Sequence, residues 1–150
     1  MKKYSNNGGN GALTIVLVRF PLTKQITTDD YSLGFHIGYD EWDDLFNNVL
    51  QVRKHAAYIE GQPYMQWEKD QKIIFREDLC KKGYPMLSRI DDIYQDVAYS
   101  QAEIGELRNE CLKLSSSTLA SRAARFALDA LIFGCDQALK TDMGIVLTGD

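Results

Sequence analysis

Apolar segments near both ends of the chain have the pattern of buried β-strands. Residues 12–20 read ALTIVLVRF and are rich in β-branched side chains, which is typical of a strand covered on both faces. Residues 144–148 read GIVLT and end the chain in the same way. A shorter segment, LGFHIGY at 33–39, predicts a further strand with Phe35 and Ile37 on one face.

Between these strands, apolar positions recur at helical spacing. The first predicted helix covers residues 40–57 and takes Asp40 as its N-cap. Its apolar residues follow one stripe that would face a core. They are Trp42, Leu45, Phe46, Val49 and Leu50.

Residues 64–82 fit two structures. They could form a hairpin with strands at 64–68 and 72–76, or a helix over about 67–82. The helix has three acid-before-base pairs at i,i+4 spacing and Gly83 at its C-terminal end. We therefore favour the helix and keep the hairpin as an alternative.

Two more helices are expected in the C-terminal half. At 100–114, Ser100 and Glu103 have the spacing of a capping box. Residues 119–140 are mostly Ala, Leu, Ile and Phe apart from one narrow polar face, which predicts a long central helix.

This order of elements predicts one α+β domain over residues 12–150, after a flexible Asn/Gly-rich arm at 1–11. The expected fold is a small mixed sheet that includes the N- and C-terminal strands. Three or four helices, with a long C-terminal one, would pack against that sheet.

Composition excludes several classes of protein. Hydrophobic residues make up 45% of the chain and charged residues 25%, as in a folded protein, and the net charge is −4. The acidic balance argues against nonspecific nucleic-acid binding. No segment is long and apolar enough for a membrane span.

The three cysteines, Cys80, Cys111 and Cys135, form no C-x-x-C pair, so we expect reduced thiols in the cytoplasm.

The sequence contains no recognisable catalytic, cofactor-binding or metal-binding motif. The glycines at 8–11 precede a strand instead of a helix, which is the wrong order for a phosphate loop. The acids at 91–96 lack the spacing of a calcium loop or of a magnesium–diphosphate motif. The two histidines, His36 and His55, lack metal-ligand spacing. A small hydrolase that uses one of them with a carboxylate is the alternative function.

Negative charge is concentrated in two segments. Between Lys24 and Arg53 there are six acidic residues and no lysine or arginine, and five more acids lie between Arg89 and Arg108. Aromatic residues accompany these acids: Tyr31, Tyr39, Trp42, Tyr94 and Tyr99. Rings framed by carboxylates suit the binding of a basic protein partner. The predicted contacts are Asp91, Asp92, Tyr94, Asp96 and Tyr99, with a second patch of Asp40, Glu41, Asp43 and Asp44.

Residues 83–99 read GYPMLSRIDDIYQDVAY and are followed by Glu103, Ile104 and Leu107. This segment resembles a "YP-LLSR-I-D-x-Y-x-D-x-x-Y/F" stretch in small bacterial proteins, some of them grouped with immunity proteins of polymorphic or contact-dependent toxin systems. The resemblance transfers no active site.

The resemblance implies a cytoplasmic, nonenzymatic protein that binds and blocks a cognate toxin, with the acidic surface covering a basic site. The same segment would also suit a structural turn in which Pro85 fixes the entry, Ser88 caps and Arg89 pairs with a neighbouring aspartate. A homo-oligomeric structural subunit is a third possibility, because the sequence leaves the oligomeric state open.

Overall fold

The computed structural model describes residues 13–19, 32–52, 60–92, 95–117 and 120–149. The arm expected at 1–11 lies outside these residues, as do Tyr94 and His55.

Four strands form one sheet in the order β2-β1-β4-β3. Their bounds are β1 Leu13–Val18, β2 Ser32–Ile37, β3 Val97–Tyr99 and β4 Gly144–Gly149. The terminal strands β1 and β4 lie at the centre and pair from Leu13 opposite Gly149 to Val18 opposite Gly144. The predicted α+β class with both terminal strands in the sheet is confirmed. All described pairings are antiparallel, however, where a mixed sheet was expected.

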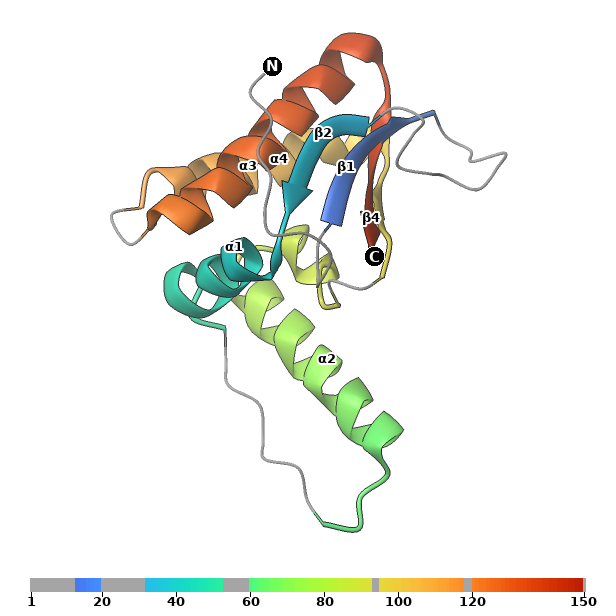
Figure 1. The fold of residues 1–150 in the computed structure, drawn as a ribbon, viewed down its shortest axis with the longest axis vertical. Coiled ribbons are helices and arrows are strands. Elements are labelled where there is room, and N and C mark those ends of the chain that lie inside the picture. Colours follow the sequence, from blue (N-terminus) through green and yellow to red (C-terminus); the bar gives the residue numbers. More distant parts are fainter. Residues whose placement is uncertain (1–12, 20–31, 53–59, 93–94, 118–119, 150) are drawn as a thin grey trace.

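The helical elements are α1 Tyr39–Asp43, the π-helical η1 Asp44–Val49, α2 Tyr64–Lys82, the 3₁₀ turn η2 Leu87–Arg89, α3 Gln101–Ser115 and α4 Arg122–Thr141. Figure 1 shows α3 and α4 side by side next to the sheet, while α2 points away from it. Among the helices in the described ranges, none combines the length and the apolar composition needed to cross a bilayer.

The main core lies between the sheet and the pair α3–α4. The long C-terminal helix is central, as predicted, since its small residues let it pack closely. At Gly134, an added Cβ would lie 3.0 Å from Cγ2 of Ile15 in β1, so a larger residue would force the Ile15 side chain to shift by a few tenths of an ångström. Helix α4 begins after Ser121, whose hydroxyl accepts a hydrogen bond from the backbone N–H of Ala124 (3.3 Å).

The helix predicted over 40–57 is shorter than expected. Its apolar stripe is buried as predicted, but the helical segment ends at Val49 and Gln51 adopts a left-handed φ of 51°. The Lys82 ammonium donates to the carbonyl oxygens of Leu50 (3.0 Å) and Gln51 (2.5 Å). Lys82, far along the chain, therefore supplies hydrogen bonds to the carbonyl groups that follow this helical segment. The periodicity of the sequence does not predict such a contact. The N-cap is Gly38 instead of Asp40.

Helix α2 confirms the helical alternative for 64–82 and excludes the hairpin. It ends at Gly83, whose φ of 95° is the left-handed conformation predicted for this glycine. Of the expected i,i+4 pairs, Asp78–Lys82 forms at 2.8 Å. Lys72 was expected to pair with Glu68 at i,i+4 spacing, but its ammonium lies 3.2 Å from Asp92, outside the helix.

Candidate functional site

The aspartates at 91 and 92, which were predicted to contact a partner, pair with α2. Asp91 forms an ion pair with Arg76, and Asp92 forms one with Lys72 (3.2 Å). Both basic residues lie on the helix that precedes this segment in the chain. The two carboxylates therefore hold α2 against the 90–92 turn, and much of their negative charge is compensated within the molecule.

Asp96 and Tyr99, two further predicted contacts, also serve the fold. The exposed Asp96 accepts a hydrogen bond from the backbone N–H of Gly149 (2.8 Å) and so joins the start of β3 to the end of β4. Tyr99 is fully buried and its hydroxyl donates to the carbonyl oxygen of Met86 (2.7 Å). Burial raises the pKa of the Tyr99 phenol well above its usual value. The prediction that Tyr99 contacts a partner is wrong, because its ring belongs to the core.

Arg89 lies at the centre of a second set of internal contacts. Its guanidinium pairs with Glu103, donates to the carbonyl oxygen of Ala98 (3.2 Å) and lies 5.4 Å from the centre of the Tyr99 ring. The hydrogen bond from Arg89 lowers the pKa of Glu103 to about 2. Glu103 also accepts the backbone N–H of Ser100 (3.0 Å), which completes the predicted capping box. Arg89 thus pairs with a glutamate instead of the neighbouring aspartate expected from the sequence.

Glu110 is a buried carboxylate that the sequence analysis missed. It accepts the backbone N–H groups of Met86 and Leu87, both at 3.0 Å, and so caps η2 from α3. Desolvation by burial raises the pKa of this carboxyl. The available signal was its position beside the apolar stripe of α3, three residues after Leu107 and one before Cys111. These bonds hold residues 86–89 and 98–99 of the segment in place as parts of a structural turn.

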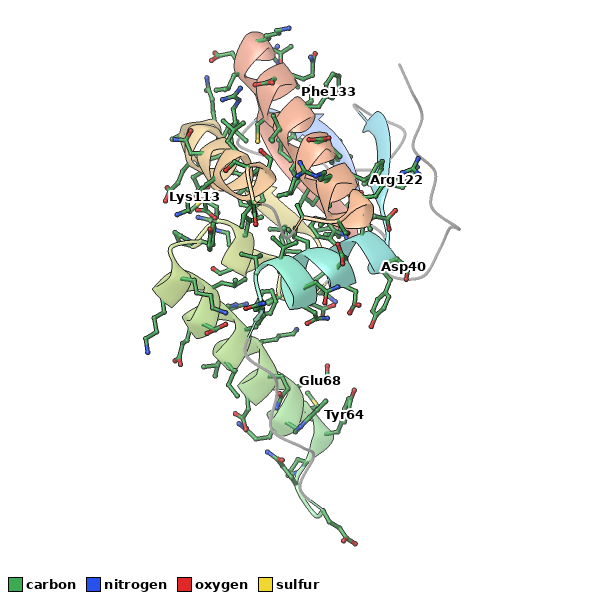
Figure 2. The ribbon with its side chains drawn as sticks, turned by 90° about the vertical axis from the view of Figure 1, so that its left-hand side faces the viewer. Asp40, Tyr64, Glu68, Lys113, Arg122 and Phe133 are labelled. Atoms are coloured by element: carbon green, nitrogen blue, oxygen red, sulfur yellow. The ribbon has the colours of Figure 1, made fainter. Side chains whose placement is uncertain are left out.

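The second predicted patch, on α1, lies in a different environment. Asp40 and Asp43 are exposed and Glu41 is partly exposed. Tyr39, which was not among the predicted contacts, is 55% exposed and lies one helical turn before Asp43. Figure 2 shows Asp40 at the outer side of α1. We call Tyr39, Asp40, Glu41 and Asp43 the acidic face of α1. The carboxylate of Asp43 accepts a hydrogen bond from Asn47 (2.5 Å) on the same surface.

Asp44 has a structural role that separates it from this patch. Its carboxylate accepts hydrogen bonds from the Ser121 hydroxyl and from the backbone N–H of Ala124 (3.1 Å). Its other oxygen accepts from Asn48 (2.6 Å). These bonds, with Ser121 contributing most, lower the pKa of the Asp44 carboxyl. Asp44 therefore caps the first turn of α4, and we remove it from the candidate contacts.

The alternative function, a hydrolase, finds no geometric support at His36. The Nδ1 atom of this ring lies 2.9 Å from the Thr14 hydroxyl, its cross-strand partner in β1. Within the described ranges, no group of three or more His, Cys, Asp or Glu side chains is placed to hold a metal ion. Cys111 and Cys135 are buried free thiols, and desolvation raises the pKa of Cys135 to about 12, which disfavours the nucleophilic thiolate.

Comparison of this chain with protein-family models, curated proteins and solved structures finds no match.

Proposed function

We propose that this protein is a nonenzymatic binding domain that recognises a basic protein surface through the acidic face of α1. The observation that carries this proposal is the exposed Tyr39 ring among carboxylates at the surface. Aromatic rings that become buried at an interface supply much of its affinity, and surrounding charges accelerate encounter with a partner of opposite sign.

The form of binding that best fits the resemblance of segment 83–99 is immunity. In that case the protein acts in the cytoplasm and neutralises a cognate bacterial toxin by covering a basic site. The net charge of −4 supports this form, because a toxin that acts on nucleic acid needs basic residues to bind phosphates.

Binding kinetics test the proposal. The probe is a protein partner recovered from the source cell by pull-down, purified and injected over the immobilised protein at two salt concentrations. The Debye length falls from about 30 Å at 0.01 M salt to about 10 Å at 0.1 M, so the association rate should fall across this range. The double variant Asp40→Asn/Asp43→Asn should slow association severalfold and weaken its salt dependence, because it removes two charges from the rim. Tyr39→Ala should mainly accelerate dissociation.

The matched control is the double variant Asp91→Asn/Asp92→Asn, which removes two charges from the segment tied to α2. It should leave both rates unchanged. Rates that respond to this control and not to the α1 variants would contradict the proposed location. Absence of binding would contradict the function itself. Co-expression with the toxin distinguishes binding from immunity. Binding without rescue of growth would support a binding domain and exclude immunity.

A further inference from the structure

Helix α2 is the element that leaves the body of the molecule. Figures 1 and 2 show its N-terminal half extending away from the sheet and from α3 and α4. Exposed apolar side chains lie along it: Tyr64 is 61% exposed, Met65 77% and Ile73 50%. Of these, Ile73 belongs to the strip described next, whereas Tyr64 and Met65 are the first two residues of the helix and lie outside that strip.

One face of α2 has a regular spacing. Five exposed residues on this face are three or four positions apart in the sequence, so they form a straight strip along the helix. We call them the outer strip of α2: Gln66, Lys69, Ile73, Glu77 and Cys80. Ile73 lies at the centre, with a base four residues before it and an acid four residues after it.

This strip is complementary to itself in one orientation. When two copies pair antiparallel about a twofold axis at Ile73, each residue meets the one equally far on the other side of position 73. Lys69 then faces Glu77 of the second copy on both sides of an Ile73–Ile73 contact. A parallel pair would instead place Lys69 against Lys69 and Glu77 against Glu77, which is repulsive.

From this complementarity we propose that α2 pairs antiparallel with α2 of a second copy of the chain, with Ile73 on the twofold axis. The 19 residues of α2 span about 28 Å at ~1.5 Å per residue. One helix pair of this length buries less than the ~800 Å² per partner of a standard stable interface. The dimer is therefore weak and depends on concentration. It is independent of the binding proposed for α1, which uses a different surface.

Native Cys80 provides an internal test of orientation. In the antiparallel pair the two Cys80 residues are about 14 residues apart along the axis, or ~21 Å, whereas a disulfide needs Cα atoms within ~7 Å. The variant Ile73→Cys/Cys80→Ser places its thiols on the axis instead. Copper–phenanthroline with dissolved oxygen removes two electrons and two protons from a thiol pair as the S–S bond forms. This variant should form covalent dimer at least severalfold faster than the native protein with Cys80.

Equal cross-linking rates, or faster linkage through Cys80, would contradict the antiparallel pair.

Charge reversal gives a second test that needs no cysteine. In sedimentation velocity over a concentration series, Lys69→Glu and Glu77→Lys should each shift the chain toward monomer. The double variant Lys69→Glu/Glu77→Lys should restore the dimer, because it rebuilds both pairs with the signs exchanged.

Circular dichroism of each variant controls for folding, and all four substituted positions are exposed. A native chain that stays monomeric up to a concentration of ~1 mM would overturn the proposal, since this corresponds to a binding free energy weaker than that of most specific contacts. Failure of the double variant to recover the dimer would overturn the register.

Discussion

Two acidic segments of this protein have similar compositions and different surroundings. On α1, Asp40 and Asp43 are at the surface beside the exposed Tyr39. In the segment 91–99, Asp91 and Asp92 form ion pairs with basic residues of α2. Its tyrosine Tyr99 is buried, in contrast to Tyr39. Carboxylates that lie beside a basic helix are compensated by it, whereas Asp40 and Asp43 on α1 remain exposed to solvent. Charge density along a sequence does not distinguish these two cases.

The largest expected difference between the two segments concerns their tyrosines. Tyr99→Ala should lower the free energy of unfolding by about 3–5 kcal/mol, because it removes a fully buried ring and leaves a cavity. Tyr39→Ala should change it by less than about 0.5 kcal/mol, as is usual for surface substitutions. Urea denaturation of both variants measures this contrast. Similar costs at the two sites would show that the Tyr39 ring is packed.

The ion pair of Glu103 with Arg89 predicts a dependence on pH. The folded-state pKa of about 2 lies below the ordinary value of 4.5, so this carboxylate contributes stability above pH 4.5 that is lost as the pH falls toward 2. Glu103→Gln should therefore cost about 1.5 kcal/mol at pH 7, after allowance for solvent screening of a partly exposed pair. The cost should shrink toward zero as the pH falls through about 2, because the Glu103 carboxyl then becomes neutral in the folded protein as well. Unfolding curves across this range measure it, and a cost that does not change with pH would exclude the ion pair as its cause.

The smallest expected effect is a difference in stability between variants of two neighbouring residues, Asp43 and Asp44. Asp44→Ala should cost about 1 kcal/mol or slightly less, because it removes one acceptor from the first turn of α4 while Ser121 still accepts from Ala124. Asp43→Ala, the matched control, should be nearly neutral for stability. Thermal unfolding at pH 7 compares the two. If Asp43→Ala is the more destabilising change, the division of this segment into surface and structural acids is wrong.

Local patterns were sufficient to predict most elements of the fold. The terminal strands, the apolar stripe from Trp42 to Leu50, the end of α2 at Gly83 and the Ser100 capping box all depend on side chains within one or two turns of each other. Strand β3 escaped prediction because its three residues are too few to show an alternation. The end of η1 escaped prediction because it is followed by the carbonyl groups of Leu50 and Gln51, which bind Lys82 from 32 and 31 residues away.

The candidate site divides in the same way. The sequence by itself determined where the carboxylates are concentrated and which apolar residues form the core. Only the tertiary structure decided which carboxylates remain at the surface. Asp91 meets Arg76, and Asp44 reaches the start of α4 across about 80 positions, through contacts that no periodicity encodes. The physical reason is that burial patterns repeat along a helix or strand, while an ion pair or a cap depends on where two separate elements happen to meet.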